Sequence, residues 1–182
     1  MDHTEAIVEF KKALRPDFIE RMLPIIKHKA KKYLSIEKKI DIKVRNVRGY
    51  SLRIDGTPTD LFYWNYVKSE IHRMYLLYKS KFPHLHTNQL TQVDLLKYSV
   101  GGKYEAHVDQ CTTIPRHLSI IMNLNDEYEG GELIFTNQQS NEIKKLNLEK
   151  GSVVFFPSNF MYPHSILPIT KGTRYSIVSW LQ

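Results

Sequence analysis

The order of two hydrophobic patterns most constrains the fold of this 182-residue chain. Residues 59–78 carry apolar side chains along one helical stripe, and the segment from Asp17 to about Leu34 has a similar spacing. Asp17 is a candidate cap for that first helix, and we expect a kink at Pro24. From Val93 onward the pattern changes to short runs typical of β-strands. The sequence therefore predicts an α+β fold, mainly β, in which helices come first and buttress one sheet.

One of the short runs indicates what lies on each side of that sheet. Alternate residues of a strand point to opposite faces, and both faces of the run 118–124 are partly apolar. This pattern is expected for a strand with a helix outside and a cavity inside. The residues of one face are Leu118, Ile120, Met122 and Leu124, and those of the other are Ser119, Ile121 and Asn123. Further upstream, residues 44–54 are predicted to form one or two strands.

The length and composition favour a single domain over residues 1–182, because a chain of this size builds one hydrophobic core. No apolar run is long enough to span a bilayer, so we expect no membrane partner. The amino terminus, Met1-Asp-His-Thr-Glu, is acidic and polar and does not read as a secretory signal. The single cysteine, Cys111, excludes an internal disulfide framework. Together these features favour the cytoplasm or another reducing compartment.

The net charge of +7 is concentrated near the amino terminus. Residues 1–50 hold 13 Lys/Arg and 7 Asp/Glu, giving +6, whereas the remaining 132 residues hold 13 and 12, giving +1. A basic face would suit nucleic acid or an acidic protein partner. A solvated lysine-rich helix around Lys27 to Lys32 is the favoured interpretation, since no aromatic groups for base stacking are interleaved there.

Two histidines and an aspartate form a candidate metal site. His107 and Asp109 lie in residues 103–109, which read as a strand, so their side chains point to the same face. His164, from a distant strand, would complete two imidazoles and one carboxylate on one side of a metal. Such a set leaves other coordination positions open, which is typical of non-haem Fe(II) oxygenases and not of closed structural zinc sites.

The segment after His164 adds a cation to this site. Apolar-rich runs on either side of residues 168–172 predict a hairpin that returns Arg174 almost opposite His164, with the strands about 5 Å apart. A guanidinium there would suit a dicarboxylic cosubstrate whose keto-acid end chelates the metal and whose far carboxylate forms a bidentate pair. A surface arginine on an edge strand is the alternative, and the spacing to His164 favours the site.

Residues 93–180 resemble the catalytic domain of the Fe(II)- and 2-oxoglutarate-dependent oxygenases, in their prolyl 4-hydroxylase-like branch. The matching segments follow the family's order: Leu96-Lys-Tyr98 with Gly101-Gly-Lys-Tyr104, His107-Val-Asp109, Ser119 to Asp126, Gly130 to Leu133, Gly151 to Pro157, and the unit from His164 to Arg174. The resemblance implies a double-stranded β-helix, a jelly-roll or cupin-like barrel. Residues 91–182 would form the catalytic barrel core, and residues 1–90 the helical support region and the first strands.

The resemblance also implies roles for individual residues. His107, Asp109 and His164 would be the iron ligands and the catalytic set. Arg174 would bind the distal carboxylate of 2-oxoglutarate, and Tyr98 matches the tyrosine that commonly helps to hold it. Many prolyl 4-hydroxylases carry lysine in place of Arg174, while arginine is usual in the oxygen-sensing and bacterial branches.

Five further residues are candidates for the surroundings of the site. Ser176 shares a strand face with Arg174 and is placed to add a hydroxyl to the cosubstrate carboxylate. Asn123 stands where some relatives have a tyrosine near the cosubstrate. Tyr104 and Trp180 are candidate substrate contacts, with core packing as the alternative. Cys111, two residues past Asp109, is expected near the metal, and a bystander role is favoured for it.

The activity that the resemblance implies is hydroxylation of an unactivated C–H bond, using Fe(II), 2-oxoglutarate and O₂, with ascorbate as an optional reductant and release of succinate and CO₂. A prolyl residue in a peptide or protein is the favoured substrate. A free amino acid or small molecule stays open, as does a non-catalytic metal-binding barrel. A nucleic-acid demethylase similar to the AlkB family is less favoured, because the second arginine expected shortly after Arg174 is missing. The oligomeric state is not indicated.

Overall fold

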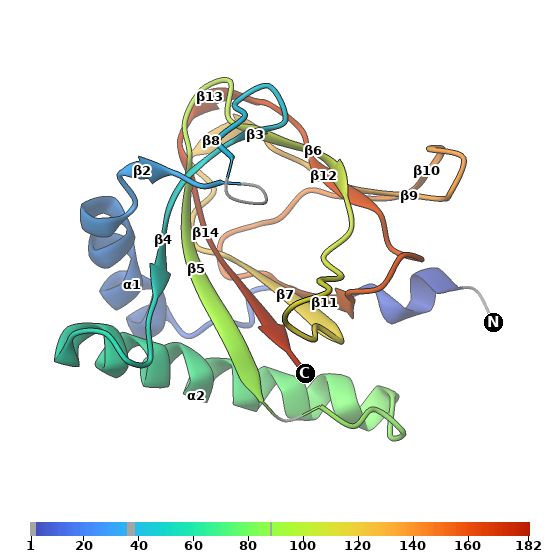
Figure 1. Ribbon diagram of the computed structural model, residues 1–182, viewed down its shortest axis with the longest axis horizontal. Helices are drawn as coiled ribbons and strands as arrows, with labels where there is room; N and C mark the ends of the chain where they lie inside the picture. Colours follow the sequence, from blue (N-terminus) through green and yellow to red (C-terminus); the bar gives the residue numbers. More distant parts are fainter. Residues whose placement is uncertain (1–2, 36–38, 88) are drawn as a thin grey trace.

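Two facing antiparallel sheets form the body of the computed structural model, which describes residues 3–35, 39–87 and 89–182 (Figure 1). The major sheet has seven strands, in the spatial order β1 (Val8–Phe10), β11 (Val153–Pro157), β7 (Leu118–Asn123), β14 (Arg174–Leu181), β5 (Leu90–Tyr98), β4 (Arg48–Leu52) and β2 (Lys32–Tyr33). The minor sheet has five, in the order β10 (Glu142–Leu146), β9 (Leu133–Thr136), β12 (His164–Ile166), β6 (Lys103–His107) and β3 (Arg45–Asn46). A separate pair joins β13 (Ile169–Gly172) to β8 (Tyr128–Gly130).

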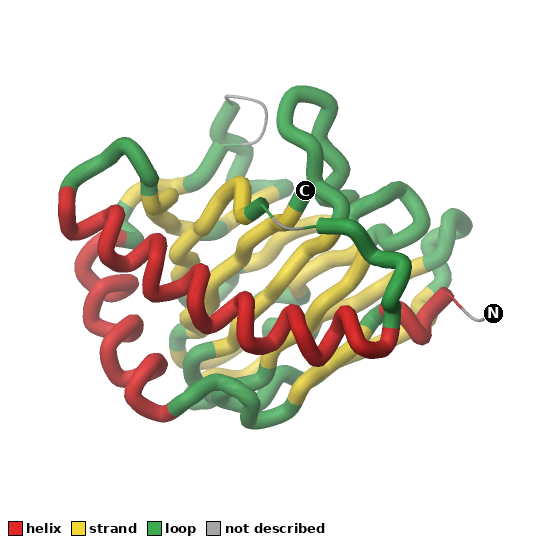
Figure 2. Tube along the Cα trace, turned by 90° about the horizontal axis from the view of Figure 1, so that it is seen from below, coloured by secondary structure: helices red, strands yellow, loops and turns green. Residues whose placement is uncertain are grey.

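The two α-helices found in the described residues cover the outer face of the major sheet, as predicted. They are α1 (Pro16–Lys29) and α2 (Pro58–Lys81), and Figure 2 shows both lying across the strands; a short 3₁₀ helix, His3–Ala6, precedes β1. One hydrophobic cluster joins them to the sheet through Phe18, Met22, Trp64, Ile71, Tyr78, Leu95, Ile120, Phe155 and Ile177. Trp64, Tyr75 and Tyr78 of α2 are therefore packing groups, whereas Phe62 is exposed. Within the described ranges, no helix has the length and apolar character required to span a bilayer.

A second hydrophobic cluster fills the space between the two sheets. Leu96, Ile121 and Phe156 of the major sheet meet Leu133, Phe135 and Ile166 of the minor sheet there. The predicted two-sided character of β7 is confirmed, because Ile120 and Met122 pack under the helices while Ile121 faces the space between the sheets. The arrangement is that of the predicted double-stranded β-helix.

The start of α2 is fixed by its own sequence. Pro58 occupies the first turn, and the Thr57 hydroxyl accepts a hydrogen bond from the backbone N–H of Asp60 at 3.2 Å. The buried Asp60 carboxylate in turn accepts from Lys29 Nζ and from the Tyr50 hydroxyl, both at 2.7 Å. A single carboxylate thus ties α1, α2 and β4 together.

The predicted bounds of the first helix were wrong at both ends. Arg15 is the N-cap residue and makes no side-chain cap hydrogen bond, so Asp17 lies in the first turn and does not cap the helix. The helix continues through Pro24 but ends at Lys29. Residues 32–33 then form β2 and pair with β4. At the edge of the major sheet their backbone groups find hydrogen-bond partners, whereas the last carbonyl groups of a helix have no partner within the helix.

The predicted hairpin between His164 and Arg174 was also wrong. His164 is in β12 and pairs with β6 and β9 of the minor sheet, with His107 as its cross-strand partner. Arg174 is in β14 and lies opposite Tyr98 in the major sheet. The intervening segment holds a strand of its own, β13, which pairs with β8. The chain crosses from one sheet to the other here, so the two residues approach across the barrel and not along a ladder.

Candidate metal centre and cosubstrate pocket

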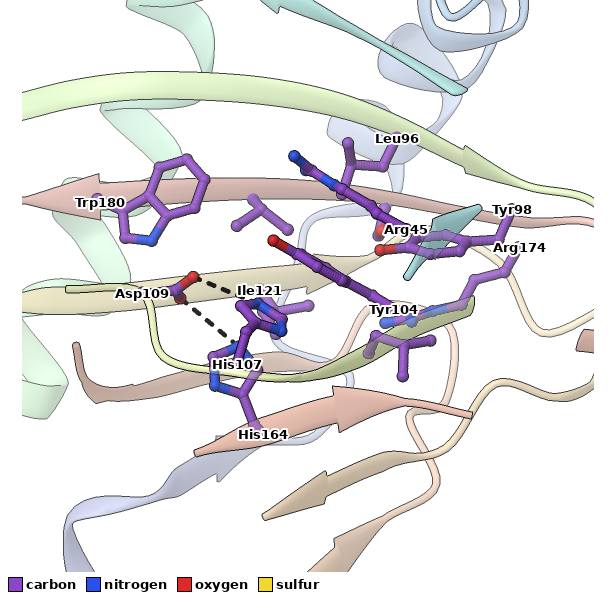
Figure 3. Close-up of a pocket in the computed structure, with 13 residues that line it drawn as sticks. Arg45, Leu96, Tyr98, Tyr104, His107, Asp109, Ile121, His164, Arg174 and Trp180 are labelled. Carbon is purple, nitrogen blue, oxygen red and sulfur yellow. Dashed lines mark ion pairs between the residues drawn. The ribbon is translucent and has the colours of Figure 1, made fainter. Parts of the chain in front are cut away.

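Three side chains converge at one mouth of the barrel. His107, Asp109 and His164 each offer a ligand atom, and these atoms all lie within 4.8 Å of one another. Asp109 Oδ1 is 3.6 Å from His107 Nε2, and its Oδ2 is 3.7 Å from His164 Nε2 (Figure 3). β6 ends at His107, so Asp109 reaches the cluster from the following loop and not from the predicted strand. The register of β12 against β6 brings the two histidines together.

The imidazole rings are oriented by backbone carbonyls. His107 Nδ1 lies 2.8 Å from the carbonyl oxygen of Glu105, and His164 Nδ1 lies 3.1 Å from that of Tyr162. Hydrogen bonds from Nδ1–H to these carbonyls leave the Nε2 lone pairs facing Asp109. The donor set therefore fits a divalent metal with two nitrogen ligands and one oxygen ligand.

The charge states also suit a metal. Burial by itself would raise the pKa of Asp109, but the neighbouring His164 and His107 and a hydrogen bond from Ser119 hold that pKa well below its usual range. Burial, with the neighbouring His107, lowers the pKa of His164 to about 4. An ionised carboxylate and a neutral imidazole are the forms that bind metal at neutral pH.

A pocket extends from the cluster, between the sheets, to Arg174. The Arg174 side chain is 1% exposed, and its Nε donates to Asn123 Oδ1 at 3.1 Å. Among the described residues, neither Nη1 nor Nη2 has a hydrogen-bond partner, and the buried Ser176 hydroxyl has none either. The guanidinium carbon lies 5.5 Å from the centre of the Tyr98 ring. A buried cationic fork with free donors requires an anion, and a carboxylate of 2-oxoglutarate fits it.

Asn123 lies behind Arg174 and does not line this pocket. Its Oδ1 accepts from Arg174 Nε and, at 3.2 Å, from the Tyr128 hydroxyl. Its Nδ2 donates to the carbonyls of Asn125 at 2.7 Å and Leu148 at 2.9 Å. The structure gives this asparagine protein partners at both ends, and its Oδ1 holds the Nε end of the Arg174 guanidinium.

Tyr104 and Trp180 stand where the pocket opens into a wider outer cleft, which Arg45, Asp94 and Arg116 also line. The Tyr104 ring stacks on His107 with 3.6 Å between ring centres, and Arg45 lies over its other side at 4.7 Å (Figure 3). The Arg116 guanidinium lies 3.9 Å from the centre of the Trp180 ring. Both predicted substrate contacts therefore line the cavity.

The sequence did not single out Arg45, Asp94 or Arg116. Asp94 had a usable signal, because its spacing from Tyr98 along β5 puts both side chains on the same face. Arg45, on a two-residue strand, and Arg116, in a loop, had none. Cys111 lines the outer cleft, and hydrogen bonds from Thr113 and nearby backbone lower the pKa of its thiol to about 7, which the sequence did not indicate.

The chain is similar to known proteins in sequence. A family model for the 2OG-Fe(II) oxygenase superfamily matches residues 93–182. A PKHD-type hydroxylase of Prochlorococcus marinus is 38% identical over an alignment of 90 residues, and this alignment covers 47% of this chain and 39% of the relative. A PKHD-type hydroxylase of a Synechococcus species is 28% identical over 93 residues, covering 47% of this chain and 40% of the relative. The alignments thus span about two fifths of the length of these relatives.

Two solved structures share the fold. A Pseudomonas putida prolyl-4-hydroxylase superposes with a TM-score of 0.76 at 16% identity, covering 97% of this chain and 92% of the other. A Trichoplax adhaerens prolyl hydroxylase in complex with a hypoxia inducible factor peptide fragment gives 0.78 at 15% identity, covering 98% and 84%. The metal cluster and Arg174 all fall within the segment that the family model matches. Through residues 93–182, this chain belongs to the 2OG-Fe(II) oxygenase superfamily, and its fold is prolyl 4-hydroxylase-like.

Proposed function

We propose that this protein is an Fe(II)- and 2-oxoglutarate-dependent dioxygenase that hydroxylates an unactivated C–H bond, most simply that of a prolyl residue in a peptide or protein. The observation that carries the proposal is one pocket that holds the cluster of two histidines and a carboxylate and also the buried Arg174, whose Nη1 and Nη2 have no hydrogen-bond partner among the described residues. A structural metal site has no use for such an arginine.

Each side chain has a role in this proposal. His107, Asp109 and His164 would hold the iron, and Arg174 would bind the distal carboxylate of 2-oxoglutarate with help from Ser176. When bound, Fe(II), 2-oxoglutarate and O₂ supply the oxidising chemistry, with succinate and CO₂ as co-products and ascorbate as an optional reductant. The protein orients these groups and keeps bulk water from the apolar part of the pocket.

The peptide substrate is supported by the shape of the site and by the relatives. The outer cleft begins at the metal cluster and runs past Tyr104 and Trp180, which gives an extended chain a path to the metal. The fold matches prolyl hydroxylases, one of them solved with a peptide. We further propose that residues 1–182 act as one domain, because α1 and α2 share a hydrophobic cluster with the major sheet.

The test is an anaerobic titration with Fe(II) and 2-oxoglutarate that follows the weak visible charge-transfer band of the chelate. The band is expected in the wild-type protein, to be lost in His164→Ala, and to require much more 2-oxoglutarate in Arg174→Ala. Arg48→Ala is the matched control, because this exposed arginine of β4 stacks on Tyr33, away from the pocket. Absence of the band in metal-loaded wild-type protein would refute the proposal.

A further inference from the structure

Arg45 and Arg116 line the outer cleft, and among the residues that the structure describes neither forms an ion pair with a carboxylate. Arg45 Nη1 donates to the Ser35 carbonyl at 3.2 Å, and its Nε is buried with no partner among the described residues. Arg116 donates to the Asp109 carbonyl at 3.2 Å and to Gln92 Oε1 at 2.9 Å, and its Nε is likewise unpaired. Elsewhere in the described chain, arginines do form ion pairs with carboxylates: Arg15, Arg53 and Arg73.

The two carboxylates that line the cleft, Asp94 and Asp109, each have partners of their own. Asp94 is buried and accepts hydrogen bonds from the Ser51 hydroxyl at 2.6 Å and from Gln92 Nε2 at 3.0 Å. Arg116 donates to the other end of the same Gln92 amide, so this amide lies between Asp94 and that arginine. Asp109 belongs to the metal cluster. With Asp109 counted at the metal, Arg45 and Arg116 outweigh Asp94 by one positive charge beside the place where a substrate must lie, and this charge favours an anionic substrate.

The aromatic rings of the cleft argue against a nucleic acid as that substrate. Stacking of a base needs an open ring face. Tyr104 has His107 on one face and Arg45 on the other, as Figure 3 shows. Trp180 is only 5% exposed and is covered by Arg116. Carboxylates, which need only the guanidinium groups, are the anions that this geometry accommodates.

We infer that the substrate is an acidic peptide, in which a carboxylate side chain next to the hydroxylated residue pairs with Arg45. The inference rests on the proposed function and narrows it. The Tyr104 ring lies between Arg45 and His107, one of the proposed metal ligands. Arg45 is therefore within reach of the peptide residue next to the hydroxylated one, once the target C–H bond is at the metal. The two ring contacts, of 4.7 and 3.6 Å, exceed the advance of about 3.3 Å per residue of an extended peptide, so the side chain of the acidic residue spans the rest of the distance.

The test compares two acetylated and amidated probe peptides, Ala-Glu-Pro-Glu-Ala and Ala-Gln-Pro-Gln-Ala. Binding is measured by calorimetry with Mn(II) in place of Fe(II) and with 2-oxoglutarate present, so that no turnover occurs. The acidic peptide should bind wild-type protein about tenfold more tightly than the amide peptide, as a charge-assisted pair predicts. That preference should disappear in Arg45→Gln and persist in Arg48→Gln, an equal loss of charge outside the cleft. Circular dichroism checks that both variants are folded.

The outcomes separate this inference from the proposed function. Equal binding of the two peptides, a preference that survives Arg45→Gln, failure of both peptides to bind, or tighter binding of a single-stranded oligonucleotide would each overturn the acidic-peptide assignment. The Fe(II) and 2-oxoglutarate charge-transfer band is recorded on the same wild-type preparation. If that band is present, the proposed function stands whichever peptide result is obtained; if it is absent, the proposed function itself fails.

Discussion

The hydroxyl of Ser119 donates a hydrogen bond to Asp109 Oδ2 at 2.7 Å, and the hydroxyl of Ser158 lies 2.7 Å from that same Ser119 hydroxyl. Both serines are buried: Ser119 is in β7 and Ser158 directly follows β11, two strands of the major sheet. Asp109, in contrast, is on a loop. A loop carboxylate without such support has many rotamers and weak directional preference. The serine pair therefore fixes one oxygen of the carboxylate that we propose to bind the metal.

Loss of this support should weaken metal binding. Ser119→Ala removes the donor to Asp109 and is expected to raise the Kd for Mn(II) about tenfold or more, as is usual for groups that orient a ligand. Anaerobic calorimetry with Mn(II) measures it. Ser69→Ala, an exposed serine of α2 that bonds only to the Tyr66 carbonyl, is the matched control. An unchanged Kd in Ser119→Ala would show that the loop holds Asp109 without help.

The Arg174 guanidinium should be required as a fork and not only as a charge. Arg174→Lys keeps the positive charge but loses both the paired Nη donors and the Nε bond to Asn123. We expect the concentration of 2-oxoglutarate that gives half-maximal thermal stabilisation, in the presence of Mn(II), to rise about tenfold. Arg48→Lys supplies the control. Equal stabilisation of Arg174→Lys and wild-type protein would mean that charge alone suffices.

The sequence predicted the part of the candidate site that depends on residue type, which is the set of side chains able to bind a metal. His107, Asp109 and His164 were recognisable because few side chains bind metal and the family's motifs surround them. The nearness of Arg174 to the site was predicted by a hairpin that does not exist: β12 and β14 belong to different sheets. Strand partners far apart in the sequence are chosen by the whole barrel, and a local hydrophobic pattern does not encode that choice.

The same limit explains the other differences. Arg45 reaches the cleft because β3 pairs with β6. These two strands are far apart in the sequence, and no local sequence pattern indicates that they pair. The first helix stops at Lys29 because the next residues gain hydrogen bonds on a sheet edge. The long stripe of α2, by contrast, was predictable, since its period and the Thr57 cap are both local.

The buried carboxylate of Asp60 should stabilise the fold in a pH-dependent way. Asp60→Asn leaves Lys29 without its partner and is expected to cost about 3 kcal/mol of unfolding free energy at pH 7. Burial would raise the pKa of Asp60, but hydrogen bonds from Lys29 and Tyr50 lower it below the ordinary value of 3.8. A lowered folded-state pKa means that the stabilisation is complete above pH 3.8 and is lost as the pH falls through the folded-state value.

Urea unfolding at several pH values measures this contribution. The gap between wild type and Asp60→Asn should be widest near pH 7 and should narrow below about pH 4. Asp55→Asn is the control, because Asp55 forms only an exposed ion pair with Arg53 and should change stability by about 0.5 kcal/mol or less. A gap that stays constant down to pH 2 would point to packing and not charge as the source of the effect.

The crossover before Arg174 should depend on a glycine for two separable reasons. Gly172 and Gly101 both have φ of +76°, which disfavours any residue with a Cβ. A Cβ at Gly172 would lie 2.3 Å from the Glu127 carbonyl oxygen, whereas at Gly101 the nearest atom is 3.9 Å away. Gly101→Ala should therefore cost about 1 kcal/mol from backbone strain alone. Gly172→Ala adds a backbone clash and should cost about 3 kcal/mol, measured by urea unfolding.

Because the clash displaces the start of β14, Gly172→Ala should also weaken 2-oxoglutarate binding at Arg174, and Gly101→Ala should not. Equal losses of stability in the two variants would mean that the crossover yields and that its position does not set the arginine.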